Sequence, residues 1–171
     1  NTAAKLLLPG LPEDMDYLNT LIEYAKRKNV ELKLASSICD NIRHESKGIF
    51  SLWDFYAIAD FITYPSVLEG FGNQFLEAIF SKTPILIFEY PVYKKDIAPL
   101  GFEIVSLGNK AELTNGLYKV NQDTIIKAKE QILEILFDTH KTSESVQKNF
   151  ELGRKYFSYD MLEEKLRYLI K

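Results

Sequence analysis

Short apolar segments alternate with longer helical patterns along most of the chain, and this alternation limits the folds it can adopt. Residues 85–88 read Ile-Leu-Ile-Phe, without the polar alternation of a half-exposed strand. A strand that is apolar on both faces indicates a sheet covered on both sides. Strands that alternate with helices form parallel units with right-handed crossovers. The predicted class is therefore α/β, with one doubly wound, mostly parallel sheet and helices at the C-terminal end.

The positions of the elements follow from apolar spacing and from turn residues. We predict strands at residues 5–8, 30–35, 61–64, 85–88 and 103–107. Helices are predicted at 11–28, from 51 onward, at 73–81, and from 123 to the end with breaks near 140 and 158–160. Ser51 to Asp54 has the form of a capping box. The first helix should bury one face, made of Met15, Leu18, Leu21, Ile22 and Ala25.

The 171 residues are the length of one domain, so we predict a single domain over 1–171. The formal charge is −3 and no basic stripe occurs, which argues against a nucleic-acid partner. One Cys and two His give no zinc-site spacing, and no metal is expected. Because the lone Cys39 cannot form an internal disulfide, a cytoplasmic location is the default expectation.

The turn after Tyr64 carries the strongest functional signal. Ligands of doubly wound sheets bind beyond the carboxyl ends of the strands, and this turn should lie there. Gly70 and Gly72 would let the backbone approach a ligand closely. With Asn73 as N-cap, the following helix would present amides suited to a diphosphate. The carboxylates of Glu69 and Glu77 could each hold a sugar diol.

Purely structural explanations exist for the same residues. A Gly-x-Gly turn can serve close packing alone, and a carboxylate such as Glu77 on a helix can simply face solvent. Asp14-Met15-Asp16 has the form of a metal-binding Asp-x-Asp motif. It falls in the first turn of a predicted helix, where acidic residues suit the helix dipole, and we interpret it as structural.

A family resemblance favours the functional interpretation of the turn. The segments at 60–66, 69–72, 76–78 and 83–86 read Asp-Phe-Ile-Thr-Tyr-Pro-Ser, Glu-Gly-Phe-Gly, Leu-Glu-Ala and Thr-Pro-Ile-Leu. In this order and spacing they resemble the signature of glycosyltransferase family 4, including its pair of glutamates with seven residues between them. The resemblance implies a GT-B fold, in which two Rossmann-like domains face each other and the C-terminal one holds the donor.

The resemblance also implies roles for individual residues. Glu77 would bind the ribose hydroxyls, and Glu69 would contact the donor sugar as the catalytic residue. The implied donor-binding set is Ser66, Glu69, Gly70, Phe71, Gly72, Asn73 and Glu77. The reaction would be a hexosyl transfer that retains anomeric configuration, with a nucleotide-diphosphate sugar as substrate and neither metal nor cofactor. The acceptor would be a sugar or a lipid-linked glycan.

The chain departs from the family pattern in its first strand–helix unit. The Gly-Arg and Lys-Gly pairs that usually bind the diphosphate have no match here, and the chain opens at Asn1 without Met. We therefore expect a fragment that lacks this unit and the N-terminal acceptor domain, and that is inactive alone. The absent domain would also be the source of any membrane association.

Two further departures concern lysines. Lys82 stands at a helix C-terminus where the family has Gly. Lys94 and Lys95 replace a glycine-rich turn and could reach the diphosphate as point charges, although two solvated surface lysines are the simpler interpretation.

The alternative function is a non-catalytic Rossmann-like nucleotide-binding or interaction module, since a fold does not fix an activity. A phospho-acceptor receiver domain is excluded, because Pro-Gly and Pro-Ser occupy its acidic positions.

Overall fold

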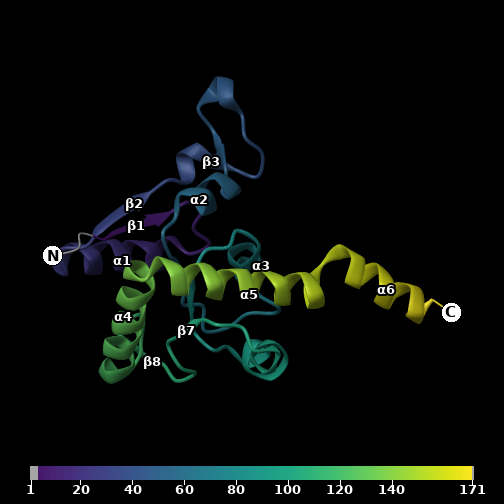
Figure 1. Cartoon of the computed structure of the whole chain (residues 1–171). Helices are drawn as coiled ribbons and strands as arrows, with labels where there is room; N and C mark the ends of the chain where they lie inside the picture. The colour runs from purple at the N-terminus through teal and green to yellow at the C-terminus, as the bar shows by residue number, and fades with distance from the viewer. Residues whose placement is uncertain (1–3, 171) are drawn as a thin grey trace. The chain divides into compact units, whose positions relative to one another are not determined.

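The computed structural model describes residues 4–170 (Figure 1). The chain forms two compact units. Unit 1 comprises residues 1–58 and 112–119, and unit 2 comprises 59–111 and 120–171.

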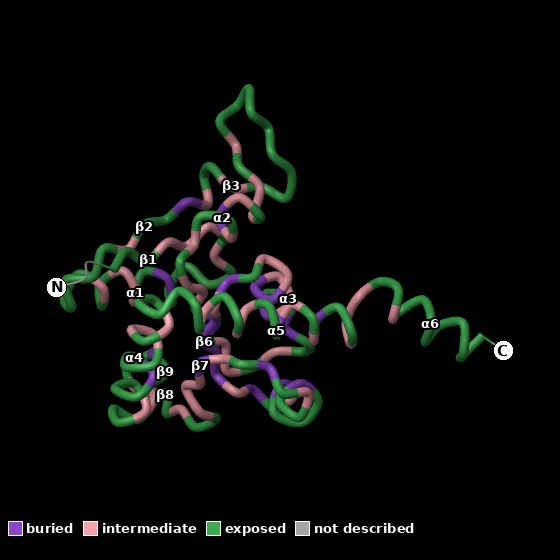
Figure 2. Tube along the Cα trace, in the orientation of Figure 1, coloured by how far each residue is buried: buried purple, intermediate pink, exposed green. Residues whose placement is uncertain are grey.

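Unit 2 contains a three-stranded parallel sheet with the strand order β5-β6-β7. The strands are β5 (Ile62–Tyr64), β6 (Ile85–Ile87) and β7 (Val105–Ser106). All three residues of the central strand are buried. This confirms the apolar run at 85–88 as a strand covered on both sides. It sits among the buried residues that Figure 2 shows around α3, β6 and β7.

Within residues 4–170, unit 2 is completed by the four α-helices α3 (Asn73–Phe80), α4 (Gln122–Phe137), α5 (Thr139–Phe157) and α6 (Tyr159–Leu169). The last of them, α6, contacts α5, and none of its residues is buried. On α4, Ala128 packs in one apolar cluster with Leu86 and Val105 of the sheet. The predicted breaks are confirmed: Asp138 and Ser158 cap the helices that follow them by accepting hydrogen bonds from Lys141 N and Met161 N.

Helices α3 and α5 lie side by side and pack closely (Figure 1). A Cβ added at Gly153 of α5 would lie 2.8 Å from a methyl carbon of Ile79, so a small residue is required there. The buried Asn149 side chain accepts a hydrogen bond from Glu103 N (2.8 Å) and donates one to Glu103 O (2.7 Å). These two bonds attach α5 to the segment that leads into β7.

Lys82 follows the Ser81 C-cap of α3 and has a left-handed backbone with φ 55°. This conformation costs a non-glycine residue about 1–2 kcal/mol. Its ammonium lies 4.4 Å from the Phe150 ring centroid and donates to Gln147 Oε1 (2.9 Å). Both partners are on α5, so contacts that glycine could not make offset the strain.

The segment between β6 and β7 has structure that the sequence did not predict. A short π-helix, η3 (Tyr93–Ile97), is followed by a 3₁₀ turn, η4 (Ala98–Leu100), which ends at Gly101 with φ 86°. Tyr93 and Ile97 are buried, whereas the three residues between them are exposed. The loop is therefore held by apolar side chains one turn apart.

Unit 1 begins with a parallel strand–helix–strand unit: β1 (Lys5–Leu8), α1 (Met15–Arg27) and β2 (Glu31–Leu34). Asp14 is the N-cap of α1, and its carboxylate accepts hydrogen bonds from two amides of the first turn. This agrees with the structural interpretation of the Asp-x-Asp motif. Leu18 is buried as predicted, but Met15 is 57% exposed, so the buried face is shorter than expected.

The remainder of unit 1 consists of short elements. They are η1 (Ser36–Ile38), β3 (Cys39–Asp40), η2 (Glu45–Lys47), β4 (Phe50–Ser51), α2 (Leu52–Ile58), β8 (Glu112–Thr114) and β9 (Leu117–Lys119). The β8–β9 hairpin was missed, although Asn115-Gly116 is a strong hairpin signal and both residues have positive φ. The predicted helix from Ser51 is confirmed one residue later.

The α/β class and parallel pairing are confirmed, and the described strands pair within small parallel sheets and one hairpin. No helix within residues 4–170 has the length and apolar character needed to span a membrane.

Asp54 holds the loop of residues 41–51 against α2. Arg43 Nε donates to its Oδ2 (3.0 Å), a second guanidinium nitrogen contacts Oδ1, and Ser51 N donates to Oδ2 (2.8 Å). Mainly because of the Arg43 hydrogen bonds, the pKa of Asp54 is lowered to about 2. The hydrogen bond from Ser51 N to the Asp54 carboxylate is the reciprocal half of the predicted capping box.

This lowered pKa predicts how the stability of unit 1 depends on pH. The ionised carboxylate stabilises the folded state above the ordinary pKa of 3.8, and this contribution is lost as the pH falls toward 2. We expect Asp54→Asn to reduce stability at pH 6 and to match the unchanged protein near pH 2, measured by denaturant unfolding. The exposed Asp96→Asn is the control. An equal deficit at both pH values would contradict the prediction.

Candidate functional site

The carboxyl edge of the unit 2 sheet places two chain segments together. β5 and β6 are parallel with Tyr64 opposite Ile87, so both strands end at the same edge. Residues 65–72 leave β5 and lead into α3, and residues 88–92 leave β6. We call residues 65–72 the Glu69 turn. It lies, as predicted, where parallel sheets bind ligands.

Gly72 is the N-cap of α3 and has a left-handed backbone with φ 89°. Asn73 was predicted as the N-cap and this was wrong: it is the first residue of the helix, and no side chain caps α3. The cause is backbone geometry, because the chain must pass through a left-handed conformation immediately before the helix. Gly70 has no positive φ and open space around it, so only the second glycine meets a steric requirement.

The side chain of Tyr90 lies beneath the Glu69 turn, and we call this ring and the aromatic rings packed around it the aromatic floor. Its hydroxyl donates to the carbonyl of Phe71 (2.8 Å), and the residue is fully buried. A Cβ added at Gly72 would overlap that hydroxyl and lie 3.0 Å from Cζ of the same ring. The closeness of this contact fits the structural explanation of the Gly-x-Gly turn for Gly72.

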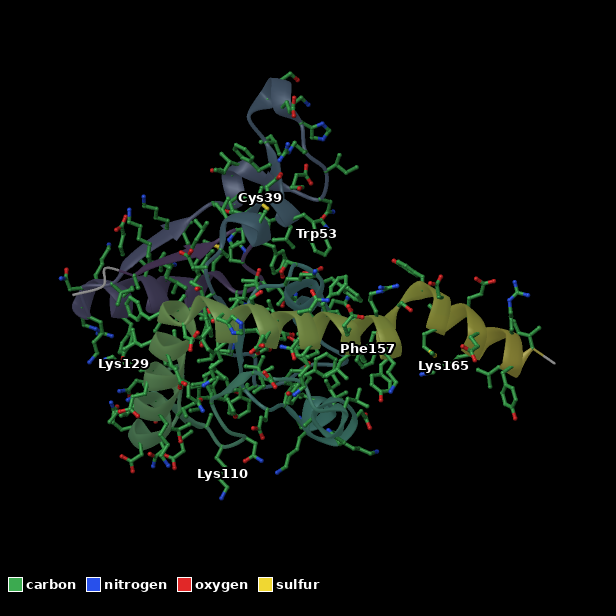
Figure 3. All side chains as sticks on the ribbon, viewed as in Figure 1. Cys39, Trp53, Lys110, Lys129, Phe157 and Lys165 are labelled. Carbon is green, nitrogen blue, oxygen red and sulfur yellow. The ribbon has the colours of Figure 1, made fainter. Side chains whose placement is uncertain are left out.

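The floor continues as a layer of aromatic rings in edge-to-face and stacked contacts. Tyr90 contacts Tyr64 (6.1 Å between centroids) and Tyr93 (5.9 Å). On the other side of the turn, the Phe71 ring meets Phe157 at 5.3 Å. Figure 3 labels Phe157 near the end of α5. Such pairs stabilise by about 0.5–1.5 kcal/mol each beyond burial, so the turn rests on a rigid base.

Burial raises the pKa of Tyr90 to about 12, and nearby Glu69 adds to the effect. The pKa of Tyr93 is also raised, by burial and then by Glu89 and Tyr90. Both phenols therefore remain protonated donors over the whole physiological range. The Glu69 carboxylate is close enough to Tyr90 to influence its proton.

A second polar group lies at the same edge, after β6 and β7. Ser106 Oγ donates to Glu89 Oε1 (2.6 Å) and accepts from Gly108 N (2.8 Å). Glu89 N also donates to Gly108 O (2.8 Å). The half-buried Glu89 is thus held beside the aromatic floor.

The start of α3 presents open amides. The first backbone hydrogen bond of the helix is donated by Phe75 N to Gly72 O (3.0 Å). The amides of Asn73 and Gln74, which precede it, have no backbone acceptor among residues 4–170. Glu77 lies four residues after Asn73 and therefore on the same helix face. It is half-buried, as is Glu69. The predicted residues thus line one helix end.

The remaining predicted residues are less constrained. Ser66 Oγ donates to Leu68 O (3.3 Å) within the turn. Lys94 and Lys95 lie on η3 with exposed side chains that make no hydrogen bond or ion pair within the described residues. Their proposed role at a diphosphate therefore stays a prediction. Within residues 4–170, no three His, Cys, Asp or Glu side chains lie close enough together to hold a metal ion.

Sequence reasoning missed Tyr90, Glu89 and Phe157. A signal existed for the first two, because they follow an apolar strand and must emerge at its carboxyl edge. Phe157 is 86 positions beyond Phe71 in the chain, and only the packing of α5 brings the two rings together.

The two glycines of the turn should respond differently to substitution. Gly72→Ala meets both a left-handed φ and the Tyr90 ring, so we expect about 2–4 kcal/mol of destabilisation. Gly70→Ala meets neither and should leave stability unchanged or raise it by up to about 1 kcal/mol. Denaturant unfolding of the two variants measures this contrast. Equal losses would show that Gly72 is not under the steric constraint described.

Comparison with known proteins gives two relatives of this chain. It is 66% identical over 157 residues to a mannosylglucosylglycerate synthase from Petrotoga mobilis, covering 92% of this chain. It is 46% identical over 159 residues to a protein of the same name from Thermotoga maritima, covering 93%. No family model and no solved structure matches. The chain spans 36% of the length of each relative, so it is homologous to about a third of a mannosylglucosylglycerate synthase.

Proposed function

We propose that this chain is the donor-binding part of a retaining glycosyltransferase of the GT-B type, and that the whole protein makes mannosylglucosylglycerate. The observation that carries the proposal is the 66% identity to a synthase of that product over nearly the whole chain. The Glu69 turn supports it independently, because Ser66 to Asn73 of the family 4 signature follow the carboxyl end of β5 and lead into α3. In this proposal residues 1–171 act as one nucleotide-sugar-binding domain with a doubly wound core.

The product in the name of these relatives suggests the substrates. A mannosyl group joined to glucosylglycerate would come from a nucleoside-diphosphate mannose, with glucosylglycerate as the acceptor. This narrows the earlier expectation of a sugar or lipid-linked acceptor to a small anionic glycoside. The acceptor would bind mainly in the part of the relatives that this chain does not span.

Each part of the turn has a role in donor binding. Glu77 accepts hydrogen bonds from the ribose diol, and the open amides of Asn73 and Gln74 point to the diphosphate at a helix N-terminus. Glu69, Gly70, Phe71 and Gly72 contact the sugar, with Ser66 shaping the start of the turn. Glu69 is the proposed catalytic residue. Amides placed where charge develops on the leaving diphosphate assist departure without a metal or cofactor.

The remaining expectations are part of the same proposal. The partners are the nucleotide sugar, the acceptor and an acceptor domain of the same enzyme, with no nucleic acid, in the cytoplasm. A non-catalytic nucleotide-binding module is the alternative, and it would bind the nucleotide without supporting transfer.

The test uses a chimera in which this chain replaces the aligned segment of the Petrotoga mobilis protein. We expect it to bind one nucleoside-diphosphate mannose and to transfer mannose to glucosylglycerate. Glu77→Gln should weaken donor binding about 10- to 100-fold, because it removes charged hydrogen bonds to a diol. Calorimetric titration with the GDP, UDP and ADP forms, together with product formation, makes the measurement.

The exposed Glu130→Gln on α4 is the matched control and should bind as the unchanged chimera does. A folded chimera that binds none of the three nucleotides would overturn the proposal. Binding without transfer would favour the non-catalytic module.

The two lysines of η3 give a separate prediction. If Lys94 and Lys95 attract the diphosphate, their double alanine variant should weaken donor binding about threefold to tenfold and reduce its dependence on salt. Lys110 and Lys129, labelled in Figure 3, are exposed lysines on other segments and supply a control pair with the same change of charge. Equal effects of the two pairs would leave only a general charge effect.

A further inference from the structure

We propose that Tyr90 is a positioning residue that holds the Glu69 turn in its binding geometry through the Phe71 carbonyl and the close contact at Gly72. The inference rests on the proposed function and adds a residue outside the signature on which that function was predicted. Tyr90 touches the turn from beneath, so it acts through Glu69 and the turn amides and not on the substrate itself.

The first observation is the hydrogen bond from the Tyr90 hydroxyl to Phe71 O (2.8 Å). It fixes a carbonyl in the middle of the segment from Glu69 to Gly72. The Phe71 carbonyl and the Gly72 N–H belong to one planar trans peptide group, so this hydrogen bond also fixes the Gly72 amide, which points away from Tyr90. One side chain thereby orients a backbone donor of the turn.

The second observation is steric. The Gly72 backbone lies so close to the Tyr90 ring that no Cβ fits between them, and Tyr90 itself is fully buried. The turn rests directly on the ring. A pre-formed turn binds a ligand more tightly than a mobile one, because it loses little conformational entropy on binding.

The third observation is that Tyr90 is held firmly. Its ring lies at an angle to Tyr64 and Tyr93 in edge-to-face contacts. Because its raised pKa keeps the hydroxyl protonated, the donor to Phe71 persists at all physiological pH values. The phenol is thus a fixed donor from a rigid layer.

Tyr93 provides a matched control within the same layer. It is 2% exposed and contacts both Tyr90 and Phe75 through its ring. Among residues 4–170, the hydroxyl that donates to the Glu69 turn is that of Tyr90, and no hydrogen bond joins the Tyr93 hydroxyl to this turn. A purely structural aromatic layer would respond alike to loss of either hydroxyl, whereas the inference assigns donor binding to Tyr90 alone.

The experiment compares Tyr90→Phe and Tyr93→Phe in the chimera described above. Tyr90→Phe should lower kcat/KM for the donor about threefold to tenfold, the effect of one hydrogen bond, while KM for the acceptor stays the same. Tyr93→Phe should leave both values unchanged. The effect of Tyr90→Phe should shrink in a Glu69→Gln background and persist in a Glu77→Gln background, because Tyr90 acts through Glu69.

Equal effects of the two tyrosine variants, or full additivity with Glu69→Gln, would overturn the inference while leaving the proposed function intact. Failure of the unchanged chimera to bind donor would instead overturn the proposed function, and the inference with it. Hydrogen exchange gives a second readout if Tyr90→Phe does not fold. The amide of Phe75, which donates to Gly72 O, should be protected at least about tenfold in the donor-free protein, and exchange at the unprotected rate would contradict a pre-formed turn.

Discussion

The contact between Gly72 and Tyr90 joins the two segments that leave the sheet of unit 2. The backbone before α3 can pass over the phenol only because residue 72 has no Cβ and accepts a left-handed φ. The start of α3, the direction of the Glu69 turn and the aromatic layer below it all depend on this approach. The two segments can meet because β5 and β6 are parallel and in register, so both strands end at the same edge of the sheet.

The layer beneath the turn also connects it with the C-terminal helices. Phe71 meets Phe157, and Phe157 stacks on Phe102, so the turn is supported from α5 as well as from the loop after β6. Within unit 2, Asn149 joins α5 to the backbone of Glu103, and Gly153 lets α5 pack closely on α3. Distant parts of the chain thereby support the same turn.

The relatives and the structure support the proposed function in different ways. Similarity over more than nine tenths of the chain connects it to proteins named for a mannosyl-containing product. The geometry adds what a name cannot: open amides at the start of α3, two half-buried carboxylates, and a floor that keeps the turn in place. The chain spans about a third of the length of these relatives, and the proposed function therefore assigns acceptor recognition mainly to the part that it does not span.

The sequence by itself determined the α/β class, most strands and helices, and the place of the Glu69 turn. These follow from apolar periodicity, capping residues and spacing, which are local properties of the chain. It misplaced the N-cap at Asn73 and missed both the β8–β9 hairpin and η3. Only the tertiary structure decided that Gly72 and not Gly70 is sterically required, and that Tyr90 and Phe157 support the turn. Such contacts depend on which segments the packed sheet and helices bring together. A local sequence pattern does not encode the spatial neighbours of a residue that are distant in the chain.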